Sequence, residues 1–597
     1  MRQHSLPSSI AFALSLFAAC DGPSAVDAGH DPHDDDAGAV VEPEPPVPQD
    51  APDPEGVPGG ETSPLALAEV GPVSVGRFVT SAACSLCHSN HDDATAMRDV
   101  RGNEIGPFNL WRATMMANAS RDPYWQAVVS VETSLRPAIA PAIEAECMKC
   151  HAPMASVTAQ DDGSTADLSW LRGGVSTGAE QVAVDGVSCS LCHQTLPDNF
   201  GTEENFTGNY MIGEQRRIYG PHQNPATAPM QNHVNYTPTY GEHMLRAELC
   251  ASCHVLETEP RAANGDPLGV AKFMEQSTYL EWLASDYGLD GADGKTCQSC
   301  HMPNTDDAEN ELETRIARSP PGPDFLINPR TPFGRHLFVG ANSVVPEILK
   351  NERATLGPQA TDAAFDAVIA LAKKRLEHEA SELSVDDVAF ADGRVSFDVT
   401  VQNRAGHKLP TGFPSRRVFV QARVLDASGE TLFVSGAFDD TGRLVVGDQV
   451  LDVEKAGGPV EPHHDVITRA HEVQIYEQVM VDEAGAPTFS LLSAVEKIKD
   501  NRVLPAGFDT SASTMGRIGP RGVDDASFVP GTDTVRYDVR VGGAPSVVEV
   551  TLYYQGISAR TVRELYQHDT PEVRAFRTML ERVDNRPVPM KTARVSL

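Results

Sequence analysis

The pattern C-x-x-C-H, two cysteines three positions apart with a histidine directly after the second, occurs five times in this chain of 597 residues. The five copies are Cys84/Cys87/His88, Cys147/Cys150/His151, Cys189/Cys192/His193, Cys250/Cys253/His254 and Cys297/Cys300/His301. Random placement of the 11 cysteines and 19 histidines would give such a match roughly 0.006 times. The pattern therefore reflects a chemical requirement, and the fold has to accommodate it five times.

Paired cysteines also occur in zinc sites, redox dithiols and disulfide frameworks, but none of these needs a histidine at the next position of every pair. Covalent haem attachment does need it, because both thiols add to porphyrin vinyl groups and the adjacent imidazole reaches the iron from the same side. We therefore expect five c-type haems. The ten motif cysteines are the expected attachment points, and His88, His151, His193, His254 and His301 are the expected proximal ligands.

The remaining cysteine, Cys20, follows an apolar run from Ile10 to Ala19 near the N-terminus. This run is typical of a secretory signal and is too short to span a membrane. A cysteine directly after "LFAA" resembles a bacterial lipoprotein box, in which the thiol is lipidated. We expect residues 1–20 to be a lipoprotein-type signal. The alternative is an ordinary secreted protein, and both readings export the chain to the periplasm or the cell surface.

An acidic, proline-rich stretch comes next and is expected to be a disordered tether over residues 21–75. Residues 21–62 contain 12 acidic side chains, nine prolines and no lysine or arginine. A stretch of this composition has too little apolar surface to offset the entropy cost of ordering the chain. The formal net charge is −35, of which −24 belongs to residues 63–597. Such an acidic body argues against nucleic acid and favours cationic redox partners, such as basic cytochromes, or a membrane oxidoreductase.

The rest of the chain divides by pattern into two regions. Successive motifs are spaced by 63, 42, 61 and 47 residues, and we expect a mostly irregular and α-helical pentahaem domain over residues 76–350. An apolar stripe over residues 362–380 predicts a helix within a connecting segment, 351–385. Val395, Phe397 and Val399 alternate with polar residues, as do several later runs, so residues 386–597 are expected to form an antiparallel β-sandwich with a last helix near Thr561 to Val583.

The second axial ligand of each iron separates an electron carrier from an enzyme, because two strong protein ligands leave no position for a substrate. His222, His243, His336 and His407 are the first candidates for this role, since each lies in a segment marked by Gly or Pro. His91 and His233 are weaker candidates for the same role. For His378, His463, His464, His471 and His568 a surface or hydrogen-bonded role is favoured. Met115 and Met116 could supply sulfur, but a Met pair on an amphipathic helix more often serves packing.

The segments "AECMKCHAP", "VSCSLCHQ", "ELCASCHVL", "YLEWLASDYG" and "CQSCHMP" resemble multihaem c-type cytochromes of the broad class that includes hydroxylamine oxidoreductase and the nitrifier tetrahaem carrier. The resemblance covers roughly residues 76–350 and implies stacked, mostly bis-histidine haems. "GHKLPTGFPSRR" resembles a turn that follows the haem domain in exported cytochromes. The enzymes of the class carry eight haems, and pentahaem nitrite reductases typically use a C-x-x-C-K motif that is missing from this sequence.

These features together predict an exported, lipid-anchored pentahaem cytochrome c that relays electrons and is more an electron carrier than a catalyst. The alternative is a reductase or oxidase of a small nitrogen or sulfur compound at one open haem. A third interpretation treats the β region as a docking module. If His407 binds iron, the β region instead completes a haem site.

Overall fold

The computed structural model describes residues 63–597 except 66, 68, 173–177, 290, 292, 321 and 512–514. The expected signal segment, Cys20 and the tether up to residue 62 lie outside the described residues. Residues 63–597 belong to one compact unit. Within the described residues, no helix has the length and apolar character needed to cross a membrane.

Ordered structure begins earlier than the expected boundary at residue 76. Leu65 is fully buried, and Leu67 and Val70 are each 9% exposed. Leu65 packs with Tyr124 and Phe576, which belong to regions far apart in the sequence. The expected tether is therefore wrong for its last part, because apolar side chains return at residue 65 and can be buried.

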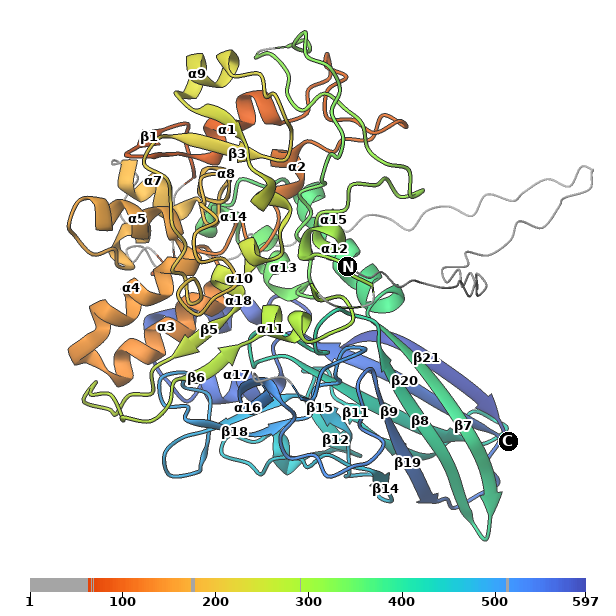
Figure 1. Ribbon diagram of the computed structural model, residues 1–597. Coiled ribbons are helices and arrows are strands. Elements are labelled where there is room, and N and C mark those ends of the chain that lie inside the picture. Colours follow the sequence, from red (N-terminus) through yellow and green to blue (C-terminus); the bar gives the residue numbers. More distant parts are fainter. Residues whose placement is uncertain are drawn as a thin grey trace, which may run out of the picture. The chain divides into compact units, whose positions relative to one another are not determined.

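The first region is a series of short helices with few strands, as expected (Figure 1). Its helices are α1 (Ser81–His88), α2 (Pro107–Trp111), α3 (Pro123–Leu135), α4 (Ala140–His151), α5 (Pro153–Asp161), α6 (Ser169–Arg172), α7 (Gly178–Val184), α8 (Cys189–Cys192), α9 (Ala228–Val234), α10 (Glu248–His254), α11 (Thr278–Leu283), α12 (Cys297–His301), α13 (Val344–Asn351) and α14 (Arg353–Leu356). Its strands are β1 (Ser74–Val75), β2 (Phe78–Val79), β3 (Arg217–Gly220), β4 (Thr237–Tyr240), β5 (Leu256–Thr258) and β6 (Phe273–Gln276). Two 3-10 turns in this region are Pro137–Ile139 and Glu242–Leu245, and a third, Asp452–Glu454, lies in the β region.

The connecting helix is confirmed as α15, Asp362–His378, with Thr361 capping its first turn through a hydrogen bond to the Ala364 amide. The remaining strands are β7 (Ser381–Ala391), β8 (Arg394–Asn403), β9 (Arg417–Leu425), β10 (Thr431–Ser435), β11 (Ala437–Phe438), β12 (Leu444–Val446), β13 (Gln449–Val450), β14 (Val466–Ile467), β15 (Ile475–Tyr476), β16 (Gln478–Val481), β17 (Pro487–Thr488), β18 (Glu496–Asp500), β19 (Thr532–Arg540), β20 (Val547–Gln555) and β21 (Val588–Ser596). The helices of this region are α16 (Met515–Ile518), α17 (Ala559–Leu565) and α18 (Pro571–Leu580).

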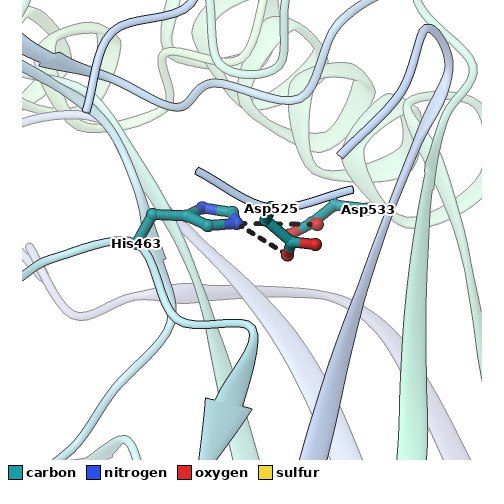
Figure 2. A group of neighbouring side chains, drawn as sticks. All are labelled: His463, Asp525 and Asp533. Atoms are coloured by element: carbon teal, nitrogen blue, oxygen red, sulfur yellow. Dashed lines mark hydrogen bonds and ion pairs between the residues drawn. The ribbon is translucent and has the colours of Figure 1, made fainter. Parts of the chain in front are cut away.

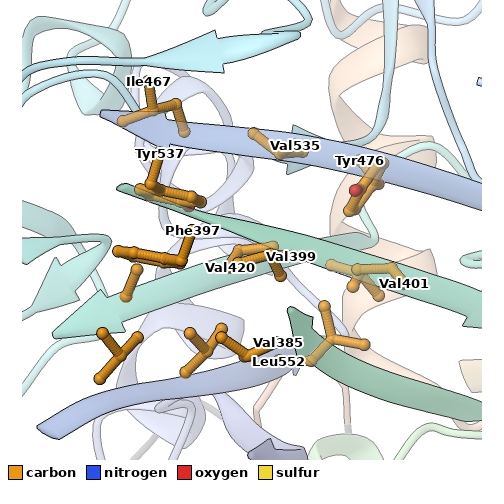
Figure 3. Packing of buried hydrophobic residues seen from close by; sticks show 14 of the residues in the cluster. Val385, Phe397, Val399, Val401, Val420, Ile467, Tyr476, Val535, Tyr537 and Leu552 are labelled. Atoms are coloured by element: carbon orange, nitrogen blue, oxygen red, sulfur yellow. The ribbon is translucent and has the colours of Figure 1, made fainter. Parts of the chain in front are cut away.

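Two larger sheets form the sandwich, in the orders β14-β19-β8-β7 and β10-β9-β20-β21, with β15 also paired to β9. Their inner faces share one core, in which Phe397 of β8 stacks on Tyr537 of β19 with ring centroids 4.8 Å apart (Figure 3). The alternating valines of β8 and β9 are buried there as the sequence predicts. The ladders are antiparallel except for the short β14, which runs parallel to β19.

The single helix expected near Thr561 to Val583 is in fact two, α17 and α18. Pro571 is the first residue of α18, and Thr570 caps it by accepting a hydrogen bond from the Val573 amide. Proline lacks the N–H that a helix interior requires, so it starts a new helix instead of continuing the first.

Candidate functional site

Each C-x-x-C-H motif lies at the end of a short helix. Helices α1, α4, α10 and α12 end on their motif histidine, while α8 ends at Cys192 with His193 as its cap. Residues three and four apart in a helix lie on the same face. The helical fold therefore presents two thiols and one imidazole from each motif in one direction.

All five motifs surround one continuous cavity of about 1910 Å³. Its wall includes the five motif histidines and every motif cysteine except Cys87. A pocket for one small ligand is roughly 300–1,000 Å³. The cavity is thus large enough for several groups that lie against one another.

Four of the five motif imidazoles are oriented by a backbone carbonyl. Nδ1 of His88 lies 3.0 Å from the Ile316 oxygen, and Nδ1 of His151 lies 2.9 Å from that of Ala119. Nδ1 of His193 is 2.6 Å from the Tyr219 oxygen, and Nδ1 of His301 is 3.2 Å from the Val339 oxygen. A carbonyl can only accept, so these rings donate from Nδ1 and present Nε2 as the metal-binding nitrogen.

Desolvation by the surrounding protein favours the neutral form of the motif imidazoles. It lowers the pKa of His151 and His301 to about 4, and it also lowers the pKa of His88, His193 and His254. Only a neutral imidazole can bind a metal, since the charged ring has no free lone pair. The donor set therefore fits haem: paired thiols for covalent attachment beside a neutral, oriented imidazole.

Motifs that are far apart in the sequence lie next to each other around the cavity. The thiol of Cys84 in the first motif contacts Cys189 in the third, and Cys150 in the second contacts Cys253 in the fourth. Cys250 in the fourth contacts Cys297 in the fifth. Groups attached at these positions would be neighbours, as passage of electrons between them requires.

Three of the candidate distal histidines, His222, His336 and His407, line this cavity. His243 is buried but is not part of the cavity wall, and its Nε2 lies 3.0 Å from the Thr195 carbonyl oxygen. His91 and His233 are likewise not part of the cavity wall. Nδ1 of His91 accepts a hydrogen bond from the Asp93 amide, and His233 is exposed on α9.

His336 lies close to the histidine of the third motif. Its ring centroid lies 6.3 Å from that of His193, and the two ring planes differ by 20°. Two imidazoles on opposite faces of one metal ion would have centroids about 6 Å apart, taking a metal–nitrogen distance of about 2.0–2.1 Å. Nδ1 of His336 lies 3.0 Å from the Gly334 oxygen, which leaves Nε2 as the metal-binding nitrogen of this ring as well.

His407 comes from the β region and is held by a buried ionic network that sequence reasoning missed. The next residue, Lys408, is fully buried, and its Nζ lies 2.9 Å from an oxygen of Asp500. Its backbone N–H donates to Glu281 of α11 at 3.1 Å. Arg502 bonds both acids, Asp500 at 2.7 Å and Glu281 at 3.0 Å.

The turn itself requires a glycine. Gly412 has φ +83°, in the left-handed region, and a Cβ there would lie 2.5 Å from Nη1 of Arg416. Nδ1 of His407 is 3.0 Å from the Lys408 carbonyl oxygen. The motif "GHKLPTG" contained the signal for a turn. Nothing in the sequence pairs Lys408 with Asp500, which is 92 positions away.

The two methionines lie in turns between α2 and α3, not on an amphipathic helix as expected. Both line the cavity. Helix α3 begins only at Pro123, with Asp122 accepting hydrogen bonds from the Tyr124 and Trp125 amides. His378 and His471 are exposed, in agreement with the surface role favoured for them.

His463 forms a second cluster of potential ligands with Asp525 and Asp533, in the β region (Figure 2). Nε2 of His463 lies 3.2 Å from an Asp525 oxygen and 3.7 Å from an Asp533 oxygen. Its Nδ1, however, accepts hydrogen bonds from the side-chain amides of Gln474, at 2.9 Å, and Asn501, at 3.1 Å. Because Nδ1 must accept, the ring proton is on Nε2, directed at the acids, and a hydrogen-bonded role fits better than a metal site.

The amide orientations in this cluster are set by the backbone. The Gln474 side-chain oxygen accepts from the His464 amide, and the Asn501 side-chain oxygen accepts from the Glu477 amide. Turning either amide around would place N–H against N–H. The hydrogen-bonded role favoured for His463 from the sequence therefore agrees with its surroundings.

Comparison with known proteins gives one structural similarity. The crystal structure of a penta-heme cytochrome c552 from Thermochromatium tepidum is similar to this chain with a TM-score of 0.48 and 16% sequence identity, over 88% of this chain and 100% of that chain. No family model matches the sequence, and no curated protein matches it significantly.

Proposed function

We propose that this chain is an exported c-type cytochrome that holds five haems covalently and passes electrons between them. The observation that carries the proposal is the single cavity: all five motif histidines and nine motif cysteines line it, and four of those histidines are oriented through Nδ1. Haem, when bound, supplies reversible one-electron chemistry at iron. The chain supplies the thiols, the axial imidazoles and a buried setting.

His336 and His407 are proposed to close the second axial position of two of these haems. His336 faces His193 at 6.3 Å between centroids, and His407 influences the pKa of both His254 and His301. On this proposal the β region is part of a haem site rather than a separate docking module. The sequence resemblance to the class of hydroxylamine oxidoreductase and the nitrifier tetrahaem carrier supports stacked haems of this kind.

Location and partners are proposed from the sequence. An exported chain with lipid on Cys20 would be bound to a membrane through a tether that carries 12 acidic side chains in residues 21–62. A Cys20→Ser variant should then be released into the soluble fraction and lack the mass of the lipid. The acidic body suits a cationic redox partner.

Haem content tests the central proposal. The chain expressed with a c-type maturation system should give five haems per polypeptide by pyridine haemochrome assay, and its intact mass should increase by five haems. Replacing Cys189 and Cys192 with Ser should remove one haem, whereas Cys20→Ser should remove none. A full count of haem in the double variant would contradict the proposed attachment.

A second candidate function is reduction or oxidation of a small nitrogen or sulfur compound at one open haem. The observation that favours it is the number of histidines. Beyond the motifs, the histidines that line the cavity within the described residues are His222, His336 and His407, too few for five irons.

A further inference from the structure

The described histidines are unevenly placed around the cavity. His336 lies beside His193, with ring centroids 6.3 Å apart, and near His88; these are the histidines of the third and first motifs. His407 lies near His254 and His301, the fourth and fifth. The second motif has no such neighbour among the described residues.

His151, the histidine of that second motif, has different surroundings. Its ring stacks on Trp125 with centroids 4.3 Å apart and planes within 4°, and its Nδ1 is held by the Ala119 carbonyl. The ring is thus fixed by an indole and a backbone oxygen. In the part of the chain that the structure describes, it has no interaction with a second imidazole.

A buried acid with a free oxygen lies beside this motif. Glu275 of β6 lines the cavity at 2% exposure and is close enough to Cys147 to raise the pKa of that thiol, after the larger effect of burial. Its Oε1 accepts only a long hydrogen bond from Gln276, at 3.4 Å, and its Oε2 has no hydrogen-bond partner. Buried polar atoms are nearly always paired, so an unpaired one beside a cavity points to a ligand.

A second acid near Cys147, Glu132, differs from Glu275 because both of its carboxylate oxygens have hydrogen-bond partners. Glu132 of α3 bonds Arg136 at 3.1 Å, the Ser490 hydroxyl at 2.9 Å and the Leu491 amide at 2.6 Å. Glu275 has no comparable set of partners. Burial also raises the pKa of Glu275 to about 8, which favours a neutral carboxyl that can donate a hydrogen bond into the cavity.

We propose that the haem on Cys147 and Cys150 is open, and that it binds a small exogenous ligand with a hydrogen-bond-accepting atom, beside which the Glu275 carboxyl lies. The inference rests on the proposed haem attachment and adds which motif is open and which side chain recognises the ligand. Glu275 acts on the ligand and not on the iron. It is therefore a binding residue that can also deliver a proton.

Carbon monoxide on the reduced holoprotein is the probe. The wild type should bind at least one carbon monoxide per chain, and one C–O stretching band should shift in Glu275→Leu, which removes the donor. Affinity for cyanide in the oxidised protein should fall about tenfold in the same variant, the effect of losing one hydrogen bond. Glu275→Gln, which keeps an N–H donor, should recover most of the affinity.

Glu259→Leu is the matched control, because Glu259 lines the same cavity but is exposed and pairs with Arg261. This variant should leave the C–O stretching band and the affinity for cyanide unchanged. If the holoprotein carries five haems and binds no carbon monoxide, the inference is overturned while the proposed function stands. Binding that Glu275→Leu leaves unaltered would overturn the assignment to the second motif, and a preparation without covalent haem would overturn the proposed function itself.

Discussion

At the scale of single residues, the placement of His407 depends on charges buried where no solvent can stabilise them. Lys408 and Asp500 are both fully buried and paired, and Arg502 bonds both Asp500 and Glu281. A buried ion is tolerated only when it is paired and hydrogen-bonded, as each of these is. The network joins α11 to the turn that presents His407.

Replacing Lys408 with Met should therefore disturb both stability and the haem beside His407. Without Lys408, the two buried acids Asp500 and Glu281 share the hydrogen-bonded cation Arg502, and breaking the buried pair should cost about 3–5 kcal/mol. Denaturant unfolding should show that loss, and the EPR spectrum should gain a high-spin component as His407 moves. Lys455→Met, which removes a pair that is largely exposed, should change neither measurement.

Asp500 also predicts how stability depends on pH. Burial alone would raise the pKa of Asp500. The charges of Arg502 and Lys408 nevertheless hold this pKa well below 3.8 in the folded chain. A folded-state pKa below the unfolded value gives stability that is complete above about pH 4 and is lost as the pH falls further. The free energy of unfolding, measured as a function of pH, should fall more steeply below pH 4 in the wild type than in Asp500→Asn. Parallel curves would contradict this contribution.

At the scale of elements, the sandwich follows directly from alternation in the sequence. β19 and β8 pair in register over nine positions, with Tyr537 opposite Phe397 and Val535 opposite Val399. Each of these side chains is 0% exposed. Period-two alternation puts one face of every strand in the core, so the pattern alone predicts which residues are buried.

Phe397→Ala should remove about 3–5 kcal/mol of stability, because it leaves a cavity beside Tyr537. The midpoint of denaturant unfolding should decrease while the haem count stays at five. Phe390→Ala is the control, since Phe390 lies on β7 at 47% exposure and should cost little. Equal losses in the two variants would show that the Phe397–Tyr537 stack is not central to the core.

At the scale of the whole molecule, the helical and β regions share their cores. One core joins Tyr124 of α3 to Phe576 of α18, and another joins Trp282 of α11 to Phe528, which comes just before β19. The cavity wall likewise draws His407 from the β region and His301 from the helical region. The two regions therefore form the candidate site together.

The charge of −24 on residues 63–597 predicts salt-dependent electron transfer to a basic cytochrome. Attraction between opposite charges raises the association rate at low salt and is screened as ionic strength rises. Stopped-flow reduction of a basic cytochrome should slow by on the order of tenfold between low and high salt. An acidic acceptor should show the opposite trend, and a salt-independent rate with both would contradict steering by charge.

The chemistry proposed for the C-x-x-C-H motifs and the class of fold could both be predicted from the sequence, because both depend on short-range rules. C-x-x-C-H needs only neighbouring residues, and period-two alternation identifies strands without reference to their partners. The sequence also named His222, His243, His336 and His407 as the first distal candidates. The tertiary structure was needed to show which motifs are neighbours, that His243 lies outside the cavity wall, and that one oxygen of Glu275 lies without a partner beside Cys147. These features depend on contacts between residues tens of positions apart or more, for which local sequence carries no signal.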